Sequence, residues 1–414
     1  MRHLYLSRRR LLGAAAAGAG LTVLPAMPAV AAPRGAKPAF RLPAPTGPHP
    51  IGTVPLHLVD PARTDPWMAP ARPRELMVQL WYPAAYPAGP PAPWLTPAEA
   101  GPVGRDLAET VSGVQRDLPG LAAVRTHAHT GAPIAARRGG WPVVLFSPGY
   151  GAGRNSSAAL VEDLASRGHV VVTVDHTHDP IAVEFPGGRV EPNTITALIA
   201  QIEDPAQFDT FAAKMVAVRS ADLRFVLDRL ATLDDGGNPD VERRRLPAGT
   251  RGSLRLTHVG ALGHSLGGAT AAQAMHDDRR IRAGVNLDGA FYGTDAAAGL
   301  DRPFLLFAAG DTDRGNTPGW GVFADHLRGW HRELRMPGAR HLAFHDSVLM
   351  IPTLAALPGA QTGDAYGTID GPRVAAVVRA YVGAFFGLHL RGSGADCGLL
   401  DAASPRYPEI GFVA

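Results

Sequence analysis

The sequence predicts an α/β protein whose mostly parallel central sheet carries helices on both faces and begins with an antiparallel edge. From residue 141 onward, continuous apolar runs of strand length alternate with segments of helical spacing, as expected of strands buried on both faces of a parallel sheet. Before them, two runs with alternating apolar residues indicate antiparallel strands. The 414 residues include 46% apolar residues, enough for a substantial core.

Residues 1–31 predict an export signal. The stretch SRRRLLG (7–13) is followed by an Ala- and Gly-rich apolar run and then by AVA (29–31), a small-residue pattern typical of a cleavage site. Arginines before a weakly apolar run favour the twin-arginine route, and an ordinary signal with an arginine-rich start is the alternative. Glycine and proline interrupt the run, so a permanent anchor is not expected, and the later chain has no uninterrupted 18-residue apolar run. The mature protein is therefore expected to be secreted.

The formal net charge of +3 comes from the same first 31 residues. They contain four arginines and no acid, and without them the chain has 36 basic and 37 acidic residues. A near-neutral body excludes the basic surface that nucleic-acid binding requires. The single cysteine, Cys397, excludes an internal disulfide and a cysteine-rich zinc site. Its place in a polar tail disfavours a role as nucleophile.

A catalytic domain is expected to span 51–390, with a lead-in before it and an insertion near its start. Residues 32–50 are Pro-rich, which favours an extended lead-in. GTVPLHLVD (52–60) and RELMVQLWYP (74–83) alternate as antiparallel edge strands do. Residues 84–139 carry many Pro, Gly and Ala residues and are interpreted as an insertion with one or two short helices.

The rest of the chain alternates between predicted strands and predicted helices. The expected strands, most of them apolar, are 141–149, 169–176, 256–265, 282–289, 303–310 and 331–338. The expected helices have apolar residues at helical spacing: 156–168, part of 206–233, 267–278, 319–330 and 374–390. Residues 391–414 are expected to form an irregular C-terminal tail. This order of elements indicates one domain with insertions.

The motif GHSLGG (263–268) lies where the strand 256–265 runs directly into the helix 267–278. A G-x-S-x-G motif in this context is typical of the nucleophile in the α/β-hydrolase fold, because the sharp turn projects the serine hydroxyl above the sheet. A lone motif of this kind is weak, and a tight glycine turn is the alternative. The context makes Ser265 the candidate nucleophile. The Leu266 N–H, at the start of the helix, is a candidate oxyanion donor.

The acid of such a fold lies between the serine and the histidine in the chain. Asp288 stands at the end of the strand 282–289, where a carboxylate can hold a histidine in the required tautomer. Asp311 and Asp313 follow the next strand and are rival candidates, with a solvated turn as their other interpretation. Asp288 is favoured because it stands directly at the strand end, beside a glycine.

The base is expected in the loop after the strand 331–338. His341 is the first histidine there, and His345 follows four residues later. This spacing would also suit a metal, but no third ligand and no H-E-x-x-H frame accompanies it. His264 is interpreted as a packed neighbour of the serine rather than as a base. His341 is therefore the candidate base, and no metal is expected.

Two further segments carry candidate site residues. FSPGYG (146–151) follows a central strand, where this fold supplies its second oxyanion N–H, and Tyr150 is the candidate because Gly149 and Gly151 allow close approach of the backbone. The stretch DHTHD (175–179) could bind a metal through its carboxylates and imidazoles. A polar strand end that lines the rim of the pocket is the favoured interpretation.

Four segments, in chain order, resemble the plasma-type platelet-activating factor acetylhydrolases of the α/β-hydrolase superfamily. They are FSPGYGAGRNSSAALVEDLASRGHVVVTVDH, GHSLGGAT, NLDGAFY and GARHLAFHD. The resemblance covers about residues 140–350 and, more weakly, 52–83. The insertion 84–139 and the tail have no clear match, so the resemblance implies the chemistry more firmly than the substrate.

The resemblance implies a residue for each role in catalysis. The nucleophile, the acid, the base and the two oxyanion donors fall, in that order, on Ser265, Asp288, His341, Leu266 and Tyr150. The family's run of a histidine, an aromatic residue and an aspartate is matched by His341, Phe344 and Asp346. One departure is Pro148, where the animal enzymes have a histidine.

The sequence thus predicts an exported serine ester hydrolase that cleaves short-acyl esters through an acyl-enzyme, without a cofactor or a metal. The resemblance implies phospholipids with an sn-2 acetyl group as substrates. A general lipase or polyester hydrolase, or acyl transfer to an alcohol at the same site, is the alternative. A non-catalytic binding protein is disfavoured by the complete Ser-Asp-His order. The expected partner is a small ester or phospholipid, with transient contact to lipid surfaces left open.

Overall fold

The predicted signal at 1–31 lies outside the residues that the computed structural model describes. The described residues are 37–293, 298–392 and 397–413. The described part of the Pro-rich lead-in, 37–50, contains no helix or strand. It is held against the body where the Thr46 N–H and hydroxyl both donate to Asp163, at 2.8 and 2.7 Å.

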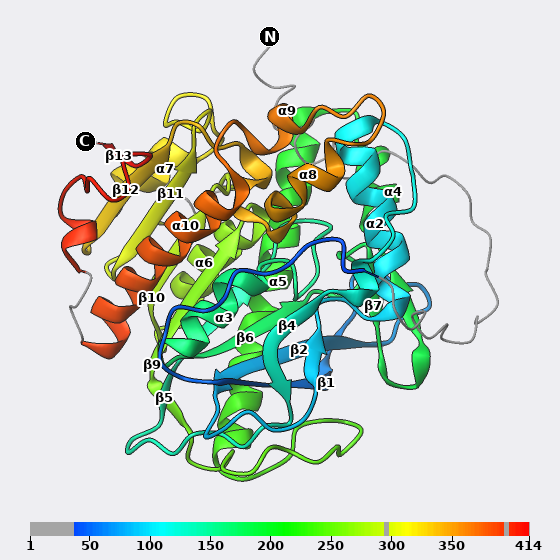
Figure 1. Cartoon of the computed structure of the whole chain (residues 1–414), viewed down its shortest axis with the longest axis vertical. Helices are drawn as coiled ribbons and strands as arrows, with labels where there is room; N and C mark the ends of the chain where they lie inside the picture. Colours follow the sequence, from blue (N-terminus) through cyan, green and yellow to red (C-terminus); the bar gives the residue numbers. More distant parts are fainter. Residues whose placement is uncertain (1–36, 294–297, 393–396, 414) are drawn as a thin grey trace.

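One sheet of 11 strands forms the centre of the molecule (Figure 1). From one edge to the other its strands are β13 (Gly411–Val413), β12 (His331–Met336), β11 (Phe304–Ala309), β10 (Ile281–Leu287), β9 (Leu254–His264), β5 (Trp141–Ser147), β6 (Val170–Asp175), β2 (Pro73–Pro83), β1 (Ile51–Thr64), β4 (Arg125–Thr130) and β3 (Pro91–Pro93). The strands from β12 to β6 are parallel, whereas β2 is antiparallel to both β6 and β1. The predicted α/β-hydrolase sheet is confirmed. A separate hairpin pairs β7 (Ala182–Glu184) with β8 (Val190–Pro192).

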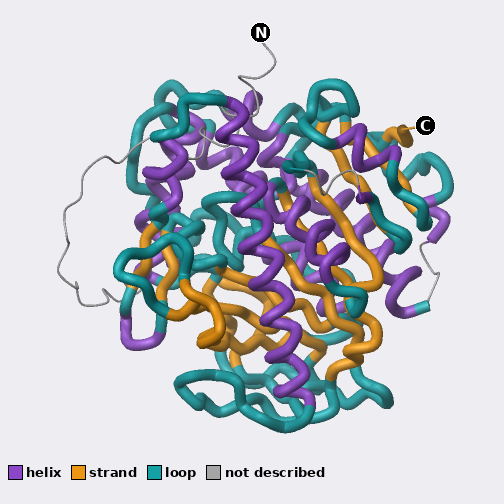
Figure 2. The backbone as a smooth tube through the Cα atoms, turned by 180° about the vertical axis from the view of Figure 1, so that it is seen from behind, coloured by secondary structure: helices purple, strands orange, loops and turns teal. Residues whose placement is uncertain are grey.

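Helices cover both faces of the sheet, as predicted. The α-helices are α2 (Pro97–Ser112), α3 (Ala158–Ser166), α4 (Ile195–Ala200), α5 (Pro205–Asp234), α6 (Leu266–Asp277), α7 (Trp320–Asp325), α8 (Ile351–Leu354), α9 (Thr362–Tyr366) and α10 (Gly371–Phe386). The shorter helical turns are η1 (Leu121–Ala123), η2 (Pro186–Gly188), η4 (His341–Phe344), η5 (Asp346–Met350), η6 (Gly387–Arg391) and η7 (Cys397–Leu400). One apolar core lies under α3 and α10, in front of the sheet in Figure 1. A second core lies under α5, α6 and α7 on the opposite face, where the long α5 crosses the middle of Figure 2.

The insertion 84–139 contains more structure than the one or two short helices expected. Its helix α2 begins at a capping box, in which the Thr96 side chain and the Glu99 side chain each accept a hydrogen bond from the other's backbone N–H. The insertion also adds β4 and β3 beyond β1, so the N-terminal strand pair is not the outermost part of the sheet. The pattern RTHAHT of β4 buries only a threonine and an alanine fully, which is why no apolar alternation indicates this strand.

The C-terminal tail is not wholly irregular, in contrast to the prediction. Its last described residues form β13, which pairs antiparallel with β12 and extends the sheet at that edge. A strand of three residues is too short for its periodicity to be read from the sequence.

The helix formed by α10 and η6 spans Gly371–Arg391 and would be long and apolar enough to cross a membrane by length and composition alone. However, 72% of its most apolar stretch is buried inside the protein. Its aromatic and aliphatic side chains belong to the core in front of the sheet. This segment is therefore a core helix of the folded protein.

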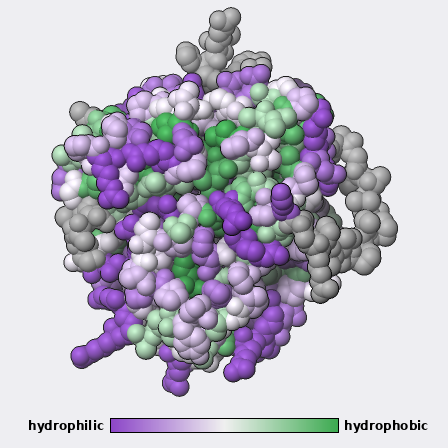
Figure 3. Space-filling model, in the orientation of Figure 1, coloured by the Kyte–Doolittle hydropathy of each residue, from purple (hydrophilic) through white to green (hydrophobic). Residues whose placement is uncertain are grey.

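The surface mixes polar and apolar side chains. In the face shown by Figure 3, hydrophilic side chains dominate and hydrophobic ones gather in smaller areas between them. The large exposed apolar side chains among the described residues come from separate parts of the chain: Tyr86, Val114, Val190, Leu198, Val241 and Val322. Scattered apolar residues of this kind are ordinary on a protein surface.

Candidate active site

Ser265 occupies the sharp turn between β9 and α6. Its backbone has φ 54° and ψ −127°, a combination that residues other than glycine rarely adopt, so the turn is strained. The flanking glycines explain how the turn can form. A Cβ on Gly263 would lie 1.9 Å from the Gly267 carbonyl oxygen, and a Cβ on Gly267 would lie 1.9 Å from the Ser147 carbonyl oxygen. The two glycines therefore allow the ends of β9 and β5 and the start of α6 to approach one another closely. This packing holds the serine at the carboxyl end of the sheet.

The structure brings together the three residues predicted for the nucleophile, the base and the acid. The Ser265 Oγ lies 2.9 Å from His341 Nε2, and His341 Nδ1 lies 2.6 Å from Asp288 Oδ2. An ionised carboxylate only accepts, so Nδ1–H donates to Asp288 and Nε2 is left to accept the serine proton. In serine hydrolases a hydrogen-bonded chain of this kind activates the serine hydroxyl.

Asp288 is buried and has donors for both of its oxygens. Besides His341 on Oδ2, the Ala309 N–H donates to Oδ1 at 2.7 Å. Burial by itself would raise the pKa of Asp288, but the hydrogen bond and the positive potential of His341, together with hydrogen bonds from Ala309 and Thr312, hold the pKa below its usual value. The carboxylate is thus kept ionised beside the imidazole.

The rival carboxylates lie elsewhere. Asp311 forms an ion pair with Arg340, with 3.0 Å between Oδ2 and Nη1. Asp313 accepts hydrogen bonds from the Gly315 and Asn316 N–H groups in a turn, as its alternative interpretation predicted. The carboxylate beside His341 Nδ1 is therefore that of Asp288 and not that of Asp311 or Asp313.

The other two histidines near Ser265 support the site without contacting the serine hydroxyl. His345 donates to or accepts from Ser347 Oγ at 3.0 Å, and burial, followed by the neighbouring His341, lowers its pKa to about 4. His264 is a packed neighbour, as predicted. Its Nε2 lies 2.9 Å from the His341 carbonyl oxygen and its ring centroid lies 4.8 Å from that of His341. Both rings help to fix the loop that carries the candidate base.

Asp346 joins this loop to two distant parts of the chain. It is buried and accepts hydrogen bonds from the Ala159 N–H at 3.2 Å and from the Trp94 indole N–H at 3.2 Å. The first donor lies at the N-terminus of α3, but burial outweighs the hydrogen bonds and raises the pKa of Asp346 to about 8. The second lies in the insertion. Asp346 thus couples the His341 loop to the insertion, a role that its position in the sequence did not reveal.

The two candidate oxyanion donors flank Ser265. Leu266 is the first residue of α6, where backbone N–H groups have no partner within the helix. Tyr150 lies in the turn after β5, and its neighbour Gly149 approaches so closely that a Cβ there would lie 3.3 Å from the Ser265 Cβ. The Tyr150 hydroxyl is 2.6 Å from Thr196 Oγ1, which holds the side chain to α4. The backbone of this turn therefore lies beside the serine.

A pocket with an empty volume of about 950 Å³, including its open part, lies in front of Ser265 and His341. The insertion forms one wall of it. That wall consists of Trp94, Leu95, Glu99, Val103, Asp106, Leu107 and Thr110. The sequence did not predict this role, because the insertion precedes the first catalytic residue by more than a hundred positions. Ile181 and Ala182, from the segment 177–205, line the same pocket.

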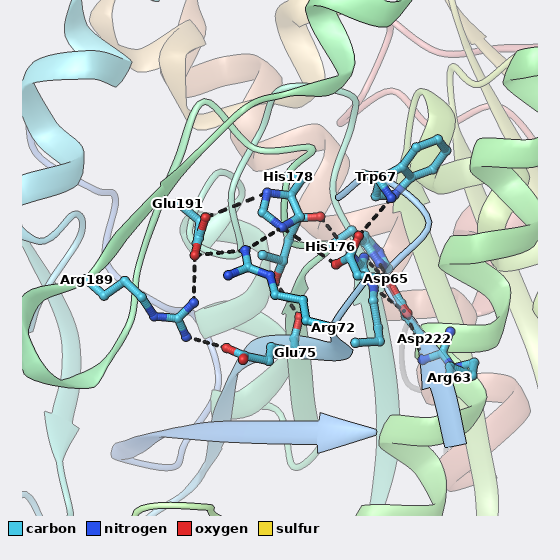
Figure 4. A network of polar contacts seen from close by, with 12 residues as sticks. Arg63, Asp65, Trp67, Arg72, Glu75, His176, His178, Arg189, Glu191 and Asp222 are labelled. Carbon is cyan, nitrogen blue, oxygen red and sulfur yellow. Dashed lines mark hydrogen bonds and ion pairs between the residues drawn. The ribbon is translucent and has the colours of Figure 1, made fainter. Parts of the chain in front are cut away.

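The predicted pocket lining at 175–179 holds for Asp175 alone, and the stretch does not form a metal site. Within the described ranges, no group of three or more His, Cys, Asp or Glu side chains is arranged to hold a metal ion. Asp175 is the member that reaches the pocket, whereas His176 and His178 are buried beneath it. Figure 4 shows these two histidines within a network of arginines and carboxylates that includes Asp222 and Glu191. Arginine partners from distant segments, invisible in the local pattern, satisfy this motif.

The fold and this geometry agree with comparisons to known proteins. Residues 34–314 match the family model of platelet-activating factor acetylhydrolase, isoform II. The chain belongs to this family. The match extends from the lead-in through β11, so it includes the elbow and the acid, while the His341 loop lies beyond it.

Proteins similar to this member of the platelet-activating factor acetylhydrolase family are named as esterases or acetylhydrolases. A protein of Arthroderma benhamiae named as a probable 1-alkyl-2-acetylglycerophosphocholine esterase is 28% identical over 90% of this chain and 94% of its own. Platelet-activating factor acetylhydrolase of Cavia porcellus is 26% identical over 40% of this chain and 39% of its own. The solved structure of a ferulic acid esterase from Streptomyces cinnamoneus is 38% identical, with a TM-score of 0.71, and the match covers 91% of this chain and all of that one. The protein is a carboxylic ester hydrolase.

Proposed function

We propose that this hydrolase acts through an acyl-enzyme, with Ser265 as nucleophile, His341 as general base and acid, and Asp288 as the group that orients the imidazole. The observation that carries the proposal is the hydrogen-bonded chain from Ser265 Oγ through His341 to Asp288, with links of 2.9 and 2.6 Å. The strained backbone at the nucleophile supports the same assignment.

In the first half of the reaction, Ser265 Oγ attacks the ester carbonyl carbon while His341 Nε2 accepts the hydroxyl proton. The bond to the leaving oxygen then breaks, and His341 gives its proton to the departing alkoxide. In the second half, water gives a proton to His341 and attacks the acyl carbon. The acyl–Ser265 bond breaks, the acid leaves and the proton returns to the serine. Asp288 stabilises the imidazolium in both halves.

The negative oxygen of each tetrahedral intermediate needs donors that are already in place. We assign this role to the N–H groups of Leu266 and Tyr150. Leu266 follows Ser265 at the N-terminus of α6, and Tyr150 lies in the turn after β5 that lines the pocket. Deleting one donor of an oxyanion hole typically costs about 3 kcal/mol of transition-state stabilisation.

A short-acyl ester is the proposed substrate, with a 2-acetyl phospholipid as the first candidate. The name of the Arthroderma benhamiae relative, which matches nearly the whole chain, supports this choice. Trp94, Leu95 and Leu107 form the apolar part of the pocket wall, which suits a hydrocarbon chain or a ring next to the ester.

An ester of an aromatic acid is the second candidate. The observation that favours it is the 38% identity over 91% of this chain to a ferulic acid esterase, a higher identity than that of the acetylglycerophosphocholine esterase. The same indole and leucine side chains could pack against an aromatic ring.

Hydrolysis rates for p-nitrophenyl esters of rising acyl length, a 2-acetyl phospholipid and methyl ferulate separate these candidates. Preference for acetyl esters and the phospholipid supports the first, and preference for ferulate supports the second. A preference for long acyl chains contradicts both. A fluorophosphonate should label the wild type and not Ser265→Ala; an unlabelled, folded wild type would reject the serine mechanism. Alkyl esters formed from an added alcohol would indicate transfer instead of hydrolysis.

Residues 1–31 are proposed to direct export by the twin-arginine route. The support is the run of arginines at positions 8–10 before a weakly apolar segment and a small-residue cleavage pattern. Replacing Arg8 and Arg9 by lysine should abolish secretion of the folded protein, measured as activity in the culture medium. Unchanged secretion would point to the general route.

A further inference from the structure

The turn that follows β5 is held from behind by a buried ion pair. Arg219, on α5, donates from Nη1 to the Pro148 carbonyl oxygen at 2.6 Å and from Nη2 to the Gly149 carbonyl oxygen at 3.4 Å. Its Nε donates to Asp179 Oδ2 at 2.9 Å. The other oxygen of Asp179 accepts a hydrogen bond from the Gly151 N–H at 3.1 Å. The pair therefore contacts the backbone of the turn on both sides of Tyr150.

These contacts set the direction of an amide. In a trans peptide the carbonyl and the N–H of one plane point in opposite directions. The Gly149 carbonyl is directed at Arg219 and also accepts from the Ala152 N–H at 3.2 Å, so the Tyr150 N–H of the same peptide points away from the guanidinium. Ser265 lies close to Gly149 in this turn. The orientation needed in an oxyanion donor thus depends on what binds the carbonyl behind it.

The neighbouring residues of the stretch 175–179 fix both ends of the same turn. His176 joins Ser147 Oγ, at 2.9 Å from Nε2, to Asp222 Oδ2, at 2.9 Å from Nδ1. Asp175 Oδ1 accepts from the Arg154 N–H at 2.5 Å and also pairs with its guanidinium. The network of Figure 4 continues from His176 and Asp222.

Burial makes this arrangement informative. Arg219 and Asp179 are each 2% exposed. A buried ion pair often contributes little net stability compared with apolar residues of the same size, because desolvating both charges is costly. Here the guanidinium spends two of its N–H groups on carbonyl oxygens of a turn that faces Ser265. Five N–H donors in one plane allow three partners at once, and a lysine ammonium cannot match that geometry.

We infer that Arg219, held by Asp179, is a positioning residue of the oxyanion hole: it fixes the peptide planes of the turn so that the Tyr150 N–H faces the oxygen of the tetrahedral intermediate. The inference rests on the proposed acyl-enzyme mechanism. It also gives the stretch 175–179 a function, since four of its contacts hold the backbone or side chains of 147–154.

The test is Arg219→Lys, with Arg379→Lys as the matched control. Arg379 is also buried, donates to the Ala44 and Ala375 carbonyl oxygens at 3.0 and 3.3 Å, and lies on α10 outside the pocket. In Arg219→Lys, kcat for an acetyl ester should fall at least about tenfold. The loss should not exceed the roughly 10²–10³-fold loss in kcat that is typical of deleting a donor. KM should change less than about threefold, because the donor acts on the transition state. Arg379→Lys should keep kcat within about threefold.

Two further measurements separate positioning from a loss of folding. The affinity for a trifluoromethyl ketone, which forms a tetrahedral adduct with the serine, should fall with kcat, while the fraction folded at the assay temperature stays that of the control. If Arg219→Lys does not fold, Asp179→Asn, which keeps an acceptor for the Gly151 N–H, should show the same kcat pattern more weakly. Unchanged kcat in a folded variant, or a rise in KM alone, overturns the inference. Fluorophosphonate labelling of the wild type reports on the mechanism independently, so failure of the inference is distinguishable from failure of the proposed function.

Discussion

Replacing Asp288 by asparagine should change the tautomer of His341 while leaving the shape of the site intact. The Asp288 Oδ1 accepts from the Ala309 N–H at 2.7 Å, so the asparagine carbonyl must take this position. Its NH₂ group then faces His341 Nδ1, which is 2.6 Å from Asp288 Oδ2. An imidazole that accepts at Nδ1 carries its proton on Nε2 and cannot take the proton of Ser265. The same change in another Ser-His-Asp enzyme lowers kcat about 10⁴-fold, which corresponds to about 5 kcal/mol.

The assay for this variant is the steady-state hydrolysis of p-nitrophenyl acetate, with the fraction of folded protein measured alongside. We expect kcat to fall by about 10³–10⁴ and KM to stay within a few-fold. Asp311→Asn is the control, because Asp311 is the rival acid and forms an ion pair with Arg340. Its kcat should stay within about threefold of the wild type, as for a partly exposed ion pair. A larger loss in Asp311→Asn, or less than about a tenfold loss in Asp288→Asn, would refute the assignment of the acid.

His341→Ala should reduce ester hydrolysis to the background rate, and His345→Ala should not, because His341 Nε2 contacts the serine hydroxyl; reversed results would mean that the loop register is misassigned. Asp346→Ala should lower the free energy of unfolding in urea by about 1–3 kcal/mol, since two buried donors lose their acceptor; an unchanged midpoint would contradict this. Val103→Trp should slow hydrolysis of longer acyl esters more than of acetate, because Val103 lines the pocket wall; equal effects on all chain lengths would argue against that wall as the limit. The lowered folded-state pKa of Asp288 should contribute stability that is present above the unfolded pKa, near 4, and lost as the pH falls through the folded value; the melting temperatures of wild type and Asp288→Asn should therefore converge as the pH falls below the unfolded pKa.

The residues placed around Ser265 could be predicted from the sequence because each follows a predicted strand, two of them strongly apolar. Ser265 follows β9, Asp288 follows β10 and His341 follows β12, and parallel strands bring their carboxyl ends to one edge. The choice of Asp288 over Asp311 depended on how directly each aspartate follows the end of its strand. In the structure Asp288 lies beside His341 Nδ1, whereas Asp311 forms an ion pair with Arg340.

What could not be predicted depends on partners far apart in the chain. Asp179 and Arg219 are 40 residues apart, and neither position gives a local pattern that names the other. Likewise, the link between Trp94 and Asp346 joins residues 252 positions apart. Short elements were missed for a different reason: β13 has three residues, too few for any period to be detected.

The wall of the pocket and the reacting residues come from different parts of the chain. Residues 94–110 supply much of the wall, whereas the serine, the acid and the base all follow position 260. The acyl group that fits and the bond that is cleaved can therefore change independently through mutation. A chimera that exchanges residues 84–139 with those of a relative, and keeps Trp94 so that Asp346 retains its donor, should acquire the donor protein's substrate preference while its rate with the smallest esters stays the same. We therefore expect the acyl preference to depend in part on a segment that contains none of the three proposed catalytic residues.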